Sequence, residues 1–62
     1  MNRQQLTRKA NKFRAMALEL VHVDAPSLGD VDASLYELAW EAHNGLCKLY
    51  KAIEKRAEEQ RP

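Results

Sequence analysis

The stretch Asp24-Ala25-Pro26-Ser27-Leu28-Gly29-Asp30 holds the only cluster of helix-breaking residues in this chain of 62 residues. Proline disfavours helical backbone at the residue before it, and glycine adds conformational freedom. The segments on either side carry apolar residues at helical spacing instead. The sequence therefore predicts one loop, over residues 23–29, that joins two helices.

The segment before this loop predicts a helix over about residues 3–22. Asn2 and Gln5 are three residues apart, which is the spacing of a capping box at a helix N-terminus. Apolar residues then recur at spacings of four and three, so that they share one helix face: Leu6, Ala10, Phe13, Ala17 and Leu20.

The segment after the loop predicts a longer helix over about residues 30–59. Ser27 with Asp30 offers one start for this helix, and Asp30 or Asp32 offers a later one. An apolar series then runs on at helical spacing: Val31, Leu35, Leu38, Ala42, Leu46, Leu49 and Ile53. Neither segment shows the alternation of a strand. We expect an all-α fold, a two-helix antiparallel hairpin that forms a single domain over residues 1–62.

The hairpin is expected to assemble into a homo-oligomeric helical bundle, a dimer or larger. A domain of about 60 residues buries only about 60% of the surface that its unfolded chain exposes. Cys47 is the single cysteine, so no internal disulfide can compensate. Folding back from the loop, the first helix is expected to cover the second only to about Tyr50, which leaves Ile53 and Ala57 for another chain. The apolar and aromatic arc of the second helix spans roughly 200°, about double what one neighbouring helix requires.

The net charge of +1 hides a strong separation of charge along the chain. Residues 1–14 hold five basic residues and no acid, residues 15–46 hold six acids and no lysine or arginine, and residues 47–62 hold five basic residues and three acids. A hairpin brings the two basic blocks together at one end and leaves the acidic block at the other. In an antiparallel dimer these charges would set the pairing and its register.

The same charges also allow a second interpretation, in which basic residues between copies attract a phosphate-bearing ligand and aromatic rings stack on its bases. Tyr50 is a further aromatic candidate. We expect no metal: His43 and Cys47 have the spacing to reach one ion, but the chain supplies no second pair of ligands. The candidate ligand-binding residues are Arg8, Lys12, Arg14, Tyr36, Trp40, His43, Lys48 and Lys51.

The sequence does not predict an enzyme. It has no glycine-rich phosphate loop, no Ser-His-Asp order and no H-E-x-x-H motif, and it calls for no cofactor. Arg3, Arg8 and Lys9 lead into an amphipathic stretch rather than the apolar core of a signal peptide, and no apolar run is long enough to span a membrane. We expect a cytoplasmic protein that does not bind membranes.

Residues 45–53, Gly-Leu-Cys-Lys-Leu-Tyr-Lys-Ala-Ile, resemble the closing segment of helical hairpins in phage anti-defence sponges, which sequester the nucleotide signals of CBASS and Thoeris immunity. Cys47 stands where that template has methionine, and Gly29-Asp30-Val31-Asp32 is similar to the polar loop before its second helix. The resemblance implies a phage protein that holds cyclic nucleotides between protomers without cleaving them. It also implies a homo-oligomer, with a hexamer of hairpins as one form, and a place for Lys51 near a phosphate.

A second resemblance concerns architecture and length alone. The plasmid copy-control hairpin called repressor of primer is similar in size and forms an antiparallel four-helix dimer that binds paired RNA loops. This likeness implies a small dimeric regulator that binds RNA or a protein partner, as the alternative to a nucleotide sponge.

Overall fold

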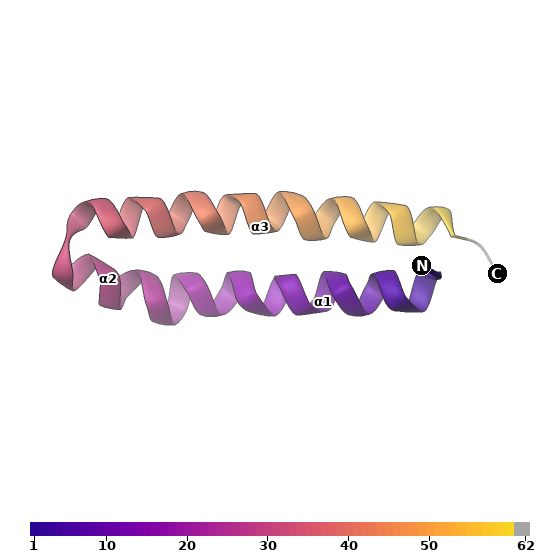
Figure 1. The fold of residues 1–62 in the computed structure, drawn as a ribbon, viewed down its shortest axis with the longest axis horizontal. Coiled ribbons are helices and arrows are strands. Elements are labelled where there is room, and N and C mark those ends of the chain that lie inside the picture. The colour runs from indigo at the N-terminus through magenta and orange to yellow at the C-terminus, as the bar shows by residue number, and fades with distance from the viewer. Residues whose placement is uncertain (61–62) are drawn as a thin grey trace.

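A computed structural model describes residues 1–60, and Arg61 and Pro62, which the sequence places in the basic C-terminal block, lie outside the described part. The described residues are 93% helical and form no strand. The elements are α1 (Arg3–Glu19), a π-helical turn η1 (Leu20–Asp24), α2 (Ala25–Val31) and α3 (Ala33–Glu59). They form a thin hairpin of 48 × 14 × 13 Å, in which α1 and α3 lie side by side and the start of α1 lies near the end of α3 (Figure 1). The all-helical prediction is confirmed.

The N-terminus of α1 forms the predicted capping box. The Asn2 side-chain oxygen accepts a hydrogen bond from the Gln5 backbone N–H at 2.9 Å, and Gln5 Oε1 accepts one from the Asn2 backbone N–H at 3.0 Å. Two of the N–H groups that a helix start leaves without partners are thereby satisfied.

The prediction of a loop over residues 23–29 is wrong, because the whole of that segment is helical. Val23 and Asp24 belong to η1, and the rest belongs to α2. Pro26 lies in the first turn of α2, where a missing backbone N–H costs little. Gly29 has no positive φ; a Cβ there would lie 3.2 Å from Tyr36 Cδ2, so glycine permits a close approach between α2 and α3.

The chain reverses direction at one extended residue, Asp32, with φ −160° and ψ 129°. Its carboxylate accepts hydrogen bonds from the Ser34 backbone N–H at 2.8 Å and from the Ser34 hydroxyl at 2.9 Å. These two bonds, the backbone bond first, lower the pKa of Asp32 below its ordinary value. Asp32 is therefore the N-cap of α3, which starts at Ala33 rather than at residue 30.

The π-helical turn keeps small residues aligned along the contact with α3. Ala17 follows Ala10 by seven residues, but Ala25 follows Ala17 by eight. In η1 the Ala25 backbone N–H bonds to the Leu20 carbonyl, five residues back, so this turn takes up the extra residue. A straight α-helix would place Asp24 on the contact face; the π turn exposes Asp24 and buries Ala25 at 0% exposure.

The buried apolar residues of the described chain are all alanines. They are Ala10, Ala17, Ala25, Ala39 and Ala57. Since alanine has the smallest apolar side chain, the two arms can approach closely along this line of residues, which we call the alanine seam. No large side chain among residues 1–60 is fully buried.

The arms of the hairpin match in length, which corrects the prediction that α1 covers α3 only to about Tyr50. Because residues 20–31 are helical, the first arm runs back along almost all of α3 (Figure 1). Ala57 is buried within the single chain, and Ile53 is half-buried. These two residues therefore do not require a second chain to cover them.

No helix in the described residues combines the length and the apolar character needed to cross a membrane.

We expect Ala17→Leu to lower the free energy of unfolding by about 1–3 kcal/mol, because a larger side chain in a close contact forces the helices apart. Ala15→Leu, at an exposed position of the same helix, is the matched control and should change stability by less than about 0.5 kcal/mol. Urea denaturation at a fixed chain concentration measures both. Equal stabilities of the two variants would contradict a close-packed alanine seam.

The lowered pKa of Asp32 predicts a specific pH dependence. Its carboxylate stabilises the fold above the ordinary pKa of 3.8, and this contribution is lost as the pH falls through the lower folded-state pKa. The substitution Asp32→Asn keeps a capping oxygen at this position but removes the titrating group. The wild type should therefore melt a few degrees above D32N at about pH 6, with the gap closing towards about pH 2. If the difference in melting temperature between the wild type and D32N stays constant over this range, titration of the Asp32 cap is not its cause. Asp30→Asn, which removes a neighbouring carboxylate, is the control.

Candidate functional site

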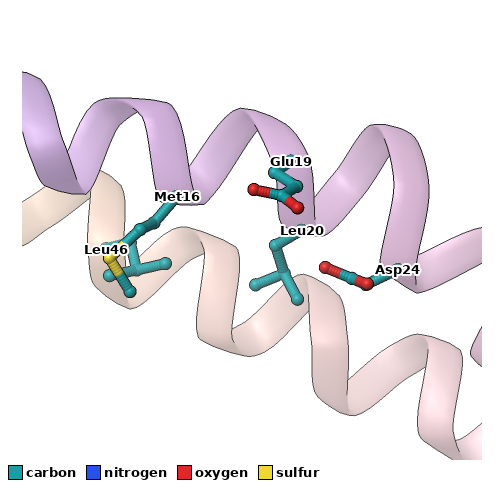
Figure 2. Close-up of a pocket in the computed structure, with 5 residues that line it drawn as sticks. All are labelled: Met16, Glu19, Leu20, Asp24 and Leu46. Atoms are coloured by element: carbon teal, nitrogen blue, oxygen red, sulfur yellow. The ribbon is translucent and has the colours of Figure 1, made fainter.

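An open groove of about 270 Å³ lies between the two arms of the hairpin, beside the middle of α3. Met16, Leu20 and Leu46 supply apolar walls, and the carboxylates of Glu19 and Asp24 stand at its rim (Figure 2). Met16 and Leu20 point from the first arm towards α3. The groove thus offers apolar surface together with negative charge, and it contains none of the predicted ligand-binding residues.

A row of aromatic and soft side chains follows one side of α3. The rings of Tyr36 and Trp40 lie edge to face with centroids 6.3 Å apart, and those of Trp40 and His43 do so at 5.1 Å. The Cys47 sulfur lies 3.5 Å from His43 Nε2. The structure therefore brings three predicted site residues, Tyr36, Trp40 and His43, into one continuous row.

The row also bears on metal binding. Residues 1–60 contain no group of three or more histidine, cysteine or acidic side chains placed to hold an ion. His43 and Cys47 contact each other as a pair on one turn of helix, and a pair alone does not meet the four-ligand requirement of a structural zinc site.

Arg14 reaches across from α1 to α3. Its Nη2 donates a hydrogen bond to Glu54 Oε2 at 2.6 Å, and its guanidinium carbon lies 5.0 Å from the centroid of the Tyr50 ring. Both charged side chains are close to half exposed, so this ion pair contributes at most about 1 kcal/mol to stability. The ion pair links the two arms in one register. It also engages the guanidinium of Arg14, which is a predicted ligand-binding residue.

Tyr50 connects this ion pair to the row on α3. A hydrogen bond with the Cys47 thiol is the main cause that raises the pKa of Tyr50 above its ordinary value, and partial burial adds to the effect. The Arg14 guanidinium acts in the opposite direction. Tyr50, an aromatic candidate from the sequence, therefore lies in a defined environment between a thiol and an ion pair.

The other four basic candidates do not converge within one chain. Arg8 and Lys12 each lie two residues from the buried Ala10, so both project from the side of α1 opposite α3. Lys48 and Lys51 are exposed on α3. Among residues 1–60, Arg14 and Glu54 form the one salt bridge, so these four cations have no carboxylate partner in the described chain.

Sequence reasoning missed two parts of this arrangement. The pairing of Glu54 with Arg14 had no signal within α3, because it depends on the register between the two arms. The groove had no signal either, because its lining combines residues of α1, η1 and α3 that meet only in the folded hairpin.

Replacing Cys47 with alanine should lower the pKa of Tyr50 towards that of a free tyrosine, because the thiol is the main cause of its shift. The measurement is a spectroscopic titration of tyrosinate in a Tyr36→Phe background, where Tyr50 is the single remaining tyrosine. Arg14→Met in the same background should move the pKa the other way. An unchanged pKa in the Cys47→Ala variant would show that the thiol does not contact the phenol.

No family model, curated protein or solved structure matches this chain. The chain's own geometry therefore carries the functional assignment. Among residues 1–60 it provides exposed cations without a carboxylate partner, an aromatic row on α3 and large apolar side chains that remain partly exposed.

Proposed function

We propose that this chain is a non-enzymatic binding protein that acts as a homo-oligomer and captures a phosphate-bearing ligand of the cyclic-nucleotide type between protomers. The observation that carries the proposal is a set of exposed cations that have no carboxylate partner among residues 1–60 and lie in the half of the hairpin away from the turn: Arg8, Lys12, Lys48 and Lys51. Phosphate groups bind well to such side chains because charge-assisted hydrogen bonds are about twice as strong as neutral ones.

The aromatic row supports a ligand with bases rather than a simple anion. The Tyr36 and Trp40 side chains are 41% and 38% exposed, so their rings offer free surface for stacking. Both lie on the turn-proximal half of α3, whereas Arg8, Lys12 and Lys51 lie in the half of the hairpin away from the turn. One hairpin therefore separates aromatic from basic groups, and a site that uses both requires a second protomer turned end to end.

The direct test is a thermal shift screen with cyclic dinucleotides and cyclic trinucleotides. A ligand that binds only the folded state adds about 2.7 kcal/mol of stability at a hundredfold excess over its dissociation constant, so the melting temperature should rise by several degrees. Normal folding with no rise for any nucleotide contradicts the proposed ligand class.

Charge reversal identifies the residues responsible. Lys51→Glu and Lys48→Glu should each reduce the shift, whereas Lys55→Glu, which changes net charge equally on the same helix, should leave most of it. Equal loss in all three variants would indicate attraction by net charge alone. Binding of structured RNA, with an affinity that falls steeply with salt, in place of nucleotides would replace the proposed ligand with RNA.

A further inference from the structure

We propose that a second copy of this chain packs antiparallel against one flank of α3 and forms a two-fold symmetric dimer. This flank, called the open flank below, begins at the half-buried Leu35 and continues with five exposed residues: Leu38, Ala42, Gly45, Leu49 and Ala52. The inference deepens the homo-oligomer in the proposed function by naming the surface and its occupant, and it does not depend on which ligand is bound.

Helix α3 carries two apolar rows, and α1 covers one of them. The covered row repeats at spacings of four and three, and all its members are buried or half-buried: Ala39, His43, Leu46, Tyr50, Ile53 and Ala57. The residues of the open flank recur at spacings of three and four, so they also share one face of the helix. Its two central leucines, Leu38 and Leu49, remain 57% and 43% exposed.

The open flank continues onto the first arm of the hairpin. Ala42 and Leu49 neighbour Leu46 on the helix surface, at four and three residues, and Leu46 is a wall of the groove in Figure 2. Met16, on the opposite wall, is 45% exposed. Apolar surface therefore extends from α3 across the groove to the first arm. A surface shared by two helices in this way is suited to packing against a second two-helix hairpin.

Gly45 is the residue that the single hairpin does not explain. It lies in the middle of α3, where glycine is less favourable than any residue except proline. A Cβ at this position would meet no atom within 4 Å, so packing inside the hairpin does not require glycine. A close approach by the backbone of another molecule would require it, and Ala42 beside it is also small and exposed.

The order of residues along the open flank fits an antiparallel copy of itself. When Ala42 faces Gly45 of the second copy, Leu38 faces the copy's Leu49 and Leu35 faces the copy's Ala52. Every contact then occurs twice about a two-fold axis that passes between residues 43 and 44. The small residues meet at the centre, and the exposed leucines close the contact on both sides.

The charged residues along the hairpin favour an antiparallel pair over a parallel one. The antiparallel register brings Arg56 level with the acidic turn of the copy, between its Asp30 and Asp32. It also brings Glu41, at the edge of the open flank, close to the level of the copy's Lys48. A parallel pair would align acidic turn with acidic turn and basic end with basic end, which disfavours it.

The exposed area agrees with one missing partner. The chain exposes 4823 Å² at 7.1 kDa, whereas a compact monomer of this mass exposes about 4,100 Å². The elongated shape of the hairpin, 48 × 14 × 13 Å, accounts for part of this excess of about 700 Å², and a standard interface removes roughly 800 Å² from each partner.

The first test is Gly45→Leu, compared with Ala15→Leu at an exposed site of α1. The hairpin has open space at Gly45, so helix content by circular dichroism should be unchanged or higher, while the mass in sedimentation falls from twice 7.1 kDa to 7.1 kDa. Ala15→Leu should keep the dimer mass. A wild type that sediments at 7.1 kDa overturns the dimer, and a dimeric Gly45→Leu variant overturns this interface while leaving another homo-oligomer open.

The second test uses chains that keep Gly45. In a Cys47→Ser background, a Leu38→Cys chain and a Leu49→Cys chain are mixed and oxidised. A disulfide needs Cα atoms about 4–7 Å apart, and residues 38 and 49 lie about 16 Å apart along a helix. The antiparallel pair therefore yields mixed 38–49 cross-links, whereas 38–38 and 49–49 cross-links would overturn the antiparallel arrangement.

These results separate the interface from the ligand. A dimer with 38–49 cross-links and no nucleotide response leaves this inference standing and removes the proposed ligand class. A nucleotide response in a chain that fails both interface tests leaves the proposed ligand class standing and removes this interface.

Discussion

The close contact between two lines of alanines is the constraint on which the rest of this structure depends. Ala10, Ala17 and Ala25 meet α3 at 0–2% exposure, and the helices come together at the smallest apolar side chain available. Each other feature of the first arm serves this contact. The π turn rotates Ala25 into it, and Asp32 ends the arm so that α3 can return alongside. Arg14 and Glu54 then fix the register of the two helices.

A seam of alanines also leaves large side chains outside it. Burial of a leucine or phenylalanine provides several times the stabilisation of a buried methyl group, and this hairpin fully buries no large side chain in its described part. The leucines of the open flank and the aromatic row remain on the two sides of α3 instead. The fold therefore has a narrow interior and two surfaces that can bind: one is aliphatic and suited to a second copy, and the other is aromatic and lies in the half of the hairpin without lysine or arginine.

The sequence predicted what depends on local chemistry. The Asn2–Gln5 capping box, the helical character of both arms and the separation of charge follow from spacing alone. The turn did not, because Pro26 fits the first turn of a helix as well as a loop, and the reversal falls on Asp32 instead. The alanine spacing of seven and then eight was the available signal for the π turn. Of the site, the row from Tyr36 to His43 was predictable, whereas the pairing of Arg14 with Glu54 required the register between arms.

The central claim is that a second copy of this chain packs on the hairpin and adds to the stability of its fold. The melting temperature of the unmodified chain, measured by circular dichroism over a hundredfold range of concentration, tests it directly. Unfolding that is coupled to dissociation gives a melting temperature that rises steadily with chain concentration. A fully helical chain that melts at the same temperature throughout this range would contradict the account, because its alanine seam alone would then suffice.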